Sequence, residues 1–143
     1  QRQRALPVPA AARMNKPFSI KGRLLSIVYA VRGVRLMLAT QHSAWLHALA
    51  TTATVAVGFY LEIDRNEWCW IVLAIMAVWT AEALNTAVEL LADVTSPHYH
   101  PLIGKAKDVS AGAVLISAIG AVVIGLLIFG PHVVVKFPCL GNF

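Results

Sequence analysis

Three apolar segments of about 20 residues each dominate this chain, and each is long enough to cross the hydrocarbon core of a bilayer as a helix. They occupy residues 44–63, 68–92 and 109–131. Hydrophobic residues make up 58% of the sequence and charged residues only 13%. A chain of 143 residues with this balance has too little polar surface to fold as a water-soluble globule. The sequence therefore predicts an all-α integral membrane protein.

Basic residues are concentrated near the N-terminus. Eight of the twelve Lys and Arg residues lie within positions 1–35, and no acidic residue precedes Glu62. The net charge of +5 could indicate a nucleic-acid partner, but so asymmetric a charge is typical of a cytoplasmic segment that faces anionic headgroups. We therefore expect the lipid bilayer, and no nucleic acid, as a partner. The same rule predicts that the N-terminus and the loop of Lys105 and Lys107 are cytoplasmic.

The segments that flank the three spans differ from them in composition. Residues 1–16 are rich in Arg, Ala and Pro and are predicted to be a disordered extension, within which Met14 is a candidate natural start. Residues 17–41 mix apolar positions with Lys and Arg, as in an amphipathic helix that lies in the membrane interface. Residues 17–131 would then form one membrane domain, and residues 132–143 a C-terminal tail without a functional signal.

A polar stripe ends the second predicted span. At ~100° per residue, Asn85 lies about 60° from Glu82, whereas Glu89 and Asp93 return to within roughly 20° of it, so the four side chains share one helix face. Placing a carboxylate in or near a bilayer costs free energy, so such residues rarely lie there without a function. The stripe is therefore predicted to be a functional site, although interhelical hydrogen bonding in a structural membrane protein would also explain it.

Phosphoryl transfer from a nucleotide suits carboxylates on a cytoplasmic face beside a loop with two lysines. This chemistry needs Mg²⁺ held by oxygen ligands, positive charge on the phosphates and a base for the accepting hydroxyl. Glu89 could hold the metal, Lys107 could meet the phosphates, and Glu82, ~10 Å deeper along the helix, could take the proton. The depth of Glu82 indicates a lipid acceptor. Neither a P-loop nor a zinc motif occurs, so a lipid kinase and a structural protein both remain open at this point.

Two motif blocks carry a family resemblance. Glu82-Ala-Leu-Asn-Thr-Ala-Val-Glu89-x-x-x-Asp93 is followed by Tyr99-His100-Pro-Leu and by Gly104-Lys-Ala-Lys107-Asp108. In this order the blocks closely resemble the small bacterial membrane kinases that comprise diacylglycerol kinase and undecaprenol kinase. The resemblance implies a multi-pass protein of the bacterial cytoplasmic membrane and a homotrimer with ATP- and lipid-binding sites formed between subunits. It implies that ATP, with Mg²⁺ as cofactor, phosphorylates the hydroxyl of a membrane lipid.

The resemblance also implies roles for individual residues. Glu82 matches the general base, Glu89 matches a Mg²⁺ ligand, and Asn85 matches the polar residue between them. Five residues match positions that are expected to face the nucleotide: Tyr29, Tyr99, His100, Lys107 and Asp108. The lipid is expected to contact the surface helix, the first span and the surroundings of Glu82.

Position 41 departs from the family pattern, because the best-known members have a second metal-binding glutamate where this chain has Gln41. An amide supplies one oxygen ligand and no charge, so Mg²⁺ binding should be weaker. A subfamily could tolerate glutamine, the nucleotide phosphates or another residue could compensate, or the protein could be a catalytically impaired oligomer that still binds nucleotide or lipid. The acceptor stays open between diacylglycerol and undecaprenol, although the His100-Pro-Leu stretch favours the undecaprenol branch.

Structural roles compete with functional ones at three further positions. Asp93 could act in catalysis or only cap the end of its helix. Asp108 could cap the third span while it contacts nucleotide. For His47, a buried hydrogen bond is favoured over chemistry.

Overall fold

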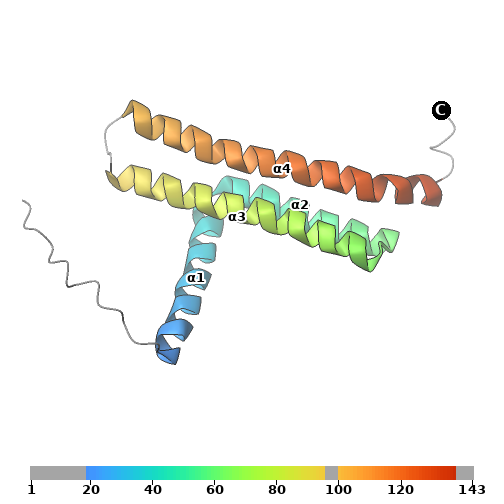
Figure 1. The fold of residues 1–143 in the computed structure, drawn as a ribbon, viewed down its shortest axis with the longest axis horizontal. Helices are drawn as coiled ribbons and strands as arrows, with labels where there is room; N and C mark the ends of the chain where they lie inside the picture. Colours follow the sequence, from blue (N-terminus) through green and yellow to red (C-terminus); the bar gives the residue numbers. More distant parts are fainter. Residues whose placement is uncertain (1–18, 96–99, 138–143) are drawn as a thin grey trace, which may run out of the picture. The chain divides into compact units, whose positions relative to one another are not determined.

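The computed structural model describes residues 19–95 and 100–137, and within them the backbone forms four α-helices. These are α1 (Ile20–Thr40), α2 (His42–Leu61), α3 (Arg65–Thr95) and α4 (Pro101–Lys136) (Figure 1). The last three helices are long and apolar enough to cross a membrane. The prediction of an all-helical chain with three candidate spans is confirmed. The chain divides into two compact units, with the boundary between Gly33 and Val34.

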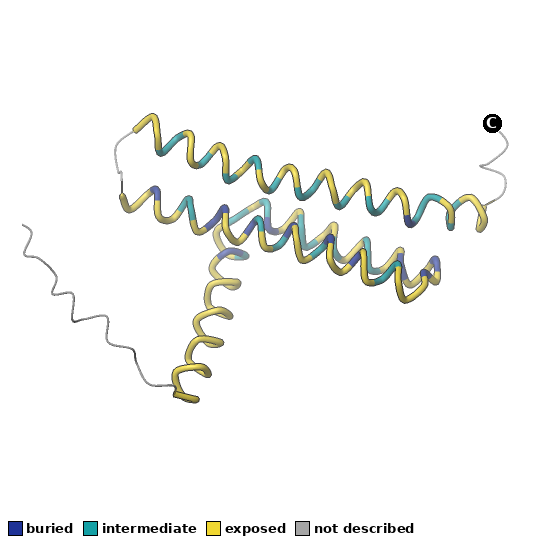
Figure 2. Tube along the Cα trace, in the orientation of Figure 1, coloured by how far each residue is buried: buried dark blue, intermediate teal, exposed yellow. Residues whose placement is uncertain are grey.

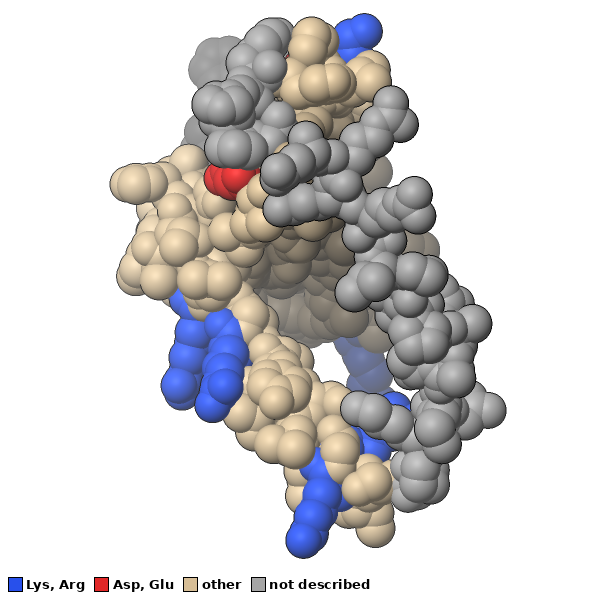
Figure 3. Space-filling view, turned by 90° about the vertical axis from the view of Figure 1, so that its left-hand side faces the viewer, with Lys and Arg blue, Asp and Glu red and all other residues tan. Residues whose placement is uncertain are grey.

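The first unit contains most of α1. Lys and Arg side chains project from the surface of this helix (Figure 3), and its residues are exposed as far as Leu36. Within α1 only Met37, which belongs to the second unit, is buried. The predicted surface helix at residues 17–41 is thus a helix from Ile20 to Thr40, while its placement in the membrane interface stays a prediction.

The second unit is organised around α3. Both α2 and α4 pack against this helix, and the tube coloured by burial shows buried positions recurring along it (Figure 2). Apart from the adjacent pair Asn85 and Thr86, the buried residues of α3 recur at intervals of three, four or six residues, as expected for one side of a helix. They are Ile71, Ala74, Val78, Glu82, Asn85, Thr86 and Ala92. One continuous face is therefore apolar at the start of α3 and polar towards its end.

The apolar core lies at the end of the bundle away from the polar stripe. Its buried members are Leu61, Ile63, Ile71 and Ile128. The backbone of Gly58 approaches this core closely, because a Cβ atom at that position would lie 2.8 Å from the ring of Trp68. The absence of a side chain at position 58 thus permits the close contact between α2 and α3.

A short polar turn connects α2 and α3, and local hydrogen bonds explain it. Glu62 ends α2 in the left-handed region, with φ of 55°. The Asp64 Oδ1 atom accepts hydrogen bonds from the backbone N–H groups of Asn66 (2.6 Å) and Glu67 (2.9 Å). In return, Glu67 Oε2 accepts one from the backbone N–H of Asp64 (2.8 Å). This reciprocal capping box fixes the start of α3.

The last helix is longer than the third span placed at residues 109–131. It begins at Pro101 because the ring Nδ1 of His100 accepts the backbone N–H of Leu102 (3.3 Å), and a proline suits the first helical position. The expectation that Asp108 caps this helix is therefore wrong. The predicted end of the span at residue 131, which is Pro131, is wrong as well, since α4 continues to Lys136. A proline near a helix end removes one backbone hydrogen bond, and side-chain contacts hold the last turns.

Those contacts tie the end of α4 to both neighbouring helices. The Lys136 Nζ atom donates to the backbone oxygen of Tyr60 (2.6 Å) on α2 and lies 4.2 Å from the centroid of the Tyr60 ring. The His132 Nε2 atom lies 3.0 Å from each carboxylate oxygen of Glu67 on α3. The tail expected from residue 132 onwards is thus helical over its first five residues.

Candidate functional site

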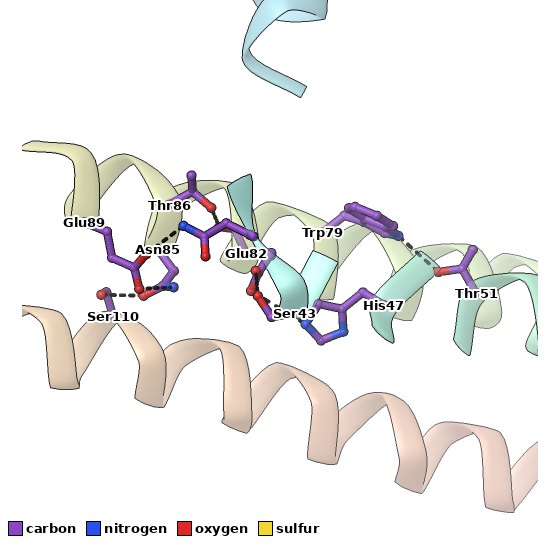
Figure 4. A network of polar contacts seen from close by, with 10 residues as sticks. Ser43, His47, Thr51, Trp79, Glu82, Asn85, Thr86, Glu89 and Ser110 are labelled. Carbon is purple, nitrogen blue, oxygen red and sulfur yellow. Dashed lines mark hydrogen bonds and ion pairs between the residues drawn. The ribbon is translucent and has the colours of Figure 1, made fainter. Parts of the chain in front are cut away.

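Glu82 is the centre of the polar face of α3, and only 1% of its surface is exposed. The Ser43 hydroxyl donates a hydrogen bond to Oε1, and the His47 Nε2 atom lies 3.6 Å from Oε2 (Figure 4). Ser43 and His47 are four residues apart on α2, so they lie on the same side of that helix. Each carboxylate oxygen of Glu82 therefore has one partner, and both partners come from α2.

The His47 ring is itself held by α3. Its centroid lies 6.4 Å from that of Trp79, with an interplanar angle of 66°, which is an edge contact. The Trp79 indole N–H donates to the Thr51 hydroxyl (3.0 Å), one turn further along α2. The expected buried hydrogen bond of His47 is therefore not observed with Glu82, because the ring is partly buried and its Nε2 atom lies 3.6 Å from the carboxylate, beyond hydrogen-bond distance.

A second polar cluster surrounds Glu89. Its carboxylate accepts hydrogen bonds from Gln41 Nε2 (2.8 Å, to Oε2) and from Asn85 Nδ2 (3.2 Å, to Oε1). The Ser110 hydroxyl of α4 donates to Asn85 Oδ1 (2.7 Å), so both ends of the Asn85 amide are engaged. Three of the residues singled out in the sequence, Gln41, Asn85 and Glu89, therefore meet at one place. Figure 4 shows Asn85 and Glu89 there, on the side of α3 that faces Ser110 of α4.

The donor set around Glu89 fits a divalent cation that prefers oxygen, such as Mg²⁺. This ion is commonly bound through one or two carboxylates, with water and substrate phosphates completing its shell. Glu89 offers the carboxylate. Gln41 and Asn85 turn their amide nitrogens towards it, so their oxygens, which are neutral ligands of the same hard type, would reach a cation there after the amides rotate. Within the described ranges, no group of three or more His, Cys, Asp and Glu residues could hold a metal by itself. The residues thus fit a cation whose remaining ligands are oxygens of a bound phosphate.

The outer end of the stripe is an ion pair. Lys107 Nζ lies 2.7 Å from Asp93 Oδ1, and the two side chains are 39% and 67% exposed. The sequence leaves Asp93 between catalysis and a helix cap, and the structure instead pairs it with the lysine expected to meet phosphates. Asp108, the residue after Lys107, is exposed on α4.

The remaining predicted nucleotide residues are His100, Tyr29 and Tyr99. His100 caps the start of α4. Tyr29 belongs to the first unit, where the Arg32 guanidinium lies 5.9 Å from its ring centroid. Tyr99 lies outside the described residues. The structure thus brings Gln41, Asn85 and Glu89 together and places Glu82 on the same buried face of α3, while the nucleotide set stays a prediction.

Three residues of the site are not predicted from the sequence. Ser43, Trp79 and Ser110 all engage the polar face of α3 or its partners. The spacing of Ser43 and His47 is an available signal, because side chains four residues apart lie on one helix face. Ser110 and Lys107 are three residues apart, so their side chains also lie on one face of a helix.

Comparison with known proteins places these features in a family. The family described as prokaryotic diacylglycerol kinase matches residues 28–129. The undecaprenol kinase of Bacillus subtilis is 41% identical over 106 residues, which cover 74% of this chain and 86% of the relative. A diacylglycerol kinase of Synechocystis is 37% identical over 103 residues, covering 71% and 59% of the two chains. The diacylglycerol kinase of Escherichia coli strain K12 is 29% identical over 104 residues, which cover 73% of this chain and 85% of the relative.

These matches confirm the resemblance carried by the two motif blocks. The family match covers most of the chain, including α2, α3 and the greater part of α4. Its span also contains the buried Glu82 and the cluster around Glu89. The chain therefore belongs to the prokaryotic diacylglycerol kinase family and is a lipid kinase with three helices able to cross a membrane.

Proposed function

We propose that this protein transfers the γ-phosphoryl group of ATP to the hydroxyl of a membrane lipid, with Glu82 as the general base. The observation that carries the proposal is the Glu82 carboxylate, which is 1% exposed and contacted at both oxygens by α2. A buried carboxylate held in this way is costly unless it is paired, and its burial is explained if it accepts a proton during catalysis.

The proposed reaction uses Glu82 at the accepting hydroxyl. The lipid oxygen forms a bond to the γ-phosphorus, the bond between that phosphorus and the bridging oxygen breaks, and ADP leaves. Glu82 takes the hydroxyl proton as the new bond forms. The Ser43 hydroxyl, which donates to Oε1, supports this role because it is an alcohol O–H in contact with the carboxylate.

The nucleotide would lie on the side of Glu89. Glu89, with the amide oxygens of Gln41 and Asn85, would hold Mg²⁺, which offsets the phosphate charge when bound. Lys107 would meet the phosphates and would exchange its contact with Asp93 for them. Further contacts are proposed for the residues that match the family's nucleotide positions: Tyr29, Tyr99, His100 and Asp108.

We infer that undecaprenol is the acceptor. The B. subtilis relative that is 41% identical is named undecaprenol kinase, whereas the diacylglycerol kinases of Synechocystis and E. coli are 37% and 29% identical. The His100-Pro-Leu stretch favours the same branch. Diacylglycerol is the second candidate because these two relatives carry its name.

The assembly and its orientation are proposed from surface and charge. In the most apolar windows of α2, α3 and α4, only 17%, 33% and 6% of the residues are buried. Such exposed apolar surface must be covered by lipid or by other subunits. We propose a homotrimer with shared active sites in the bacterial inner membrane, with the N-terminus and the site cytoplasmic.

An assay of the purified protein in mixed micelles tests the proposal. Transfer of labelled γ-phosphate from ATP would be measured with undecaprenol, with diacylglycerol and without lipid, each with and without Mg²⁺. We expect Mg²⁺-dependent labelling that is fastest with undecaprenol and absent without lipid. Faster labelling of diacylglycerol would reverse the acceptor assignment. Nucleotide binding without labelling of either lipid would favour the impaired protein that Gln41 suggests.

A further inference from the structure

We propose that Ser43 and His47 are positioning residues that hold the Glu82 carboxylate in one orientation, with Oε1 engaged and Oε2 left to accept the substrate proton. This inference rests on the proposed role of Glu82 as the base. It adds two residues of α2 to the site and distinguishes the two oxygens of one carboxylate.

The first step concerns Oε1. The Ser43 hydroxyl donates a hydrogen bond to this oxygen, and a hydroxyl has a single proton to donate. The second hydroxyl near Glu82, that of Thr86, donates to the Glu82 backbone oxygen at 3.0 Å and so does not compete for the carboxylate. Ser43 thus fixes one end of the group from a neighbouring helix.

The second step concerns Oε2. The His47 Nε2 atom lies 3.6 Å from this oxygen, which is longer than a hydrogen bond. Oε2 therefore receives no hydrogen bond from His47 and keeps its capacity to accept a proton. His47, unlike Glu82, lines an apolar groove between α2, α3 and α4, so a lipid in this groove would reach the histidine that lies next to Oε2. Oε2 is thus the oxygen suited to a lipid hydroxyl.

The third step concerns the position of His47 itself. Its ring rests edge-on against Trp79 (6.4 Å between centroids), and the Trp79 indole is bonded to Thr51. These contacts connect α2 to α3 next to the carboxylate and restrict how far the imidazole can turn. Because a side chain in a catalytic site acts only within a narrow range of geometry, loss of either α2 contact should slow turnover more than it weakens binding.

The test measures kcat and KM separately, for ATP and for undecaprenol, in Ser43→Ala and His47→Leu. Each change removes one contact of a carboxylate, so kcat should fall about 10- to 100-fold with both KM values changed less than about threefold. In His47→Gln a polar N–H group is again available near Oε2, and this variant should recover at least a third of the kcat lost in His47→Leu. Equal kcat in the Leu and Gln variants would contradict a positioning role for the imidazole.

Two matched variants control for unspecific damage. Thr52→Ala removes a hydroxyl from the same helix, but that hydroxyl bonds only to the backbone oxygen of Ala48 (2.8 Å). His132→Leu removes another histidine that contacts a glutamate on α3. His132 lies near the C-terminal end of α4, and its Nε2 atom is 3.0 Å from Glu67 Oε2. Both controls should keep kcat within about twofold of the unmodified protein. A loss as large as in Ser43→Ala would show that the effect is not specific to Glu82 and would overturn the inference.

Glu82→Gln separates the two proposals. If this variant is inactive while folded Ser43→Ala and His47→Leu keep full kcat, the positioning inference fails and the base assignment stands. If Glu82→Gln keeps full kcat, both fail. Size-exclusion profiles and thermal unfolding report folding. Should Ser43→Ala not fold, Ser43→Thr retains the hydroxyl: near-normal kcat in that folded variant supports the inference, and a kcat below a tenth of normal overturns it.

Discussion

Gln41 donates a hydrogen bond of 2.8 Å from its side-chain Nε2 to Glu89 Oε2 and so joins the start of α2 to the polar face of α3 across 48 residues of sequence. Two carboxylates at such a distance would repel one another in the absence of a cation. An amide and a carboxylate attract, so this part of the site is stable without a metal. In the proposed Mg²⁺ site, the glutamine would therefore lower the affinity for the cation and raise the stability of the metal-free protein.

Gln41→Glu should reverse that exchange. The added carboxylate gives Mg²⁺ a second charged ligand, and the Mg²⁺ concentration for half-maximal activity should fall about tenfold. The same variant should unfold at a lower temperature than the unmodified protein when Mg²⁺ is chelated, because the introduced carboxylate would face Glu89 without a cation. Titration of Mg²⁺ at fixed ATP and thermal unfolding with a chelator measure the two effects. An unchanged Mg²⁺ dependence would exclude position 41 from the cation site.

Asp93→Asn should release Lys107 for the nucleotide. In the structure the lysine contacts Asp93 at 2.7 Å, and both side chains are substantially exposed. Exposed pairs are weak, so KM for ATP should fall only about two- to fivefold, with kcat unchanged. Lys107→Met should raise KM for ATP by about tenfold or more. A rise of KM in Asp93→Asn would instead mean that the carboxylate supports nucleotide binding, for example through a cation.

Gly58→Ala should destabilise the bundle. The new Cβ atom would lie 2.8 Å from the Trp68 ring and 3.2 Å from the Ile63 side chain, and overpacking of this kind costs about 1–3 kcal/mol. Gly120→Ala on α4 is the matched control, since nothing lies within 4 Å of the Cβ that it adds. Thermal unfolding in detergent should show a lower midpoint for the first variant only. Equal midpoints would contradict the close approach of α2 and α3 at Gly58.

Most of the fold follows from local sequence signals, whereas helix ends depend on contacts that are distant in sequence. Apolar segments of sufficient length predict the three candidate spans, and all three are helical. Pro131 locally predicts a stop, but the helix continues because Lys136 and His132 are held by α2 and α3. Asp108 locally predicts a cap, but the ring of His100 provides it eight residues earlier.

The same distinction applies to the site. Helical periodicity predicts that Glu82, Asn85 and Glu89 share a face, because that relation lies within one helix. It does not predict which side chains of α2 and α4 meet this face: Ser43 is 39 residues from Glu82, and Ser110 is 25 residues from Asn85. Such partners depend on how the helices pack, which hydrophobic periodicity alone leaves undetermined.

The general-base role of Glu82 is tested most directly by the turnover of Glu82→Gln with undecaprenol, ATP and Mg²⁺. The substitution keeps the size of the side chain and a carbonyl oxygen for the Ser43 hydroxyl, but removes the capacity to accept the substrate proton. We predict that kcat falls by about 10²- to 10⁴-fold, while the KM for ATP and the oligomeric state stay unchanged. Turnover equal to that of the unmodified protein would contradict the assignment of Glu82 as the base.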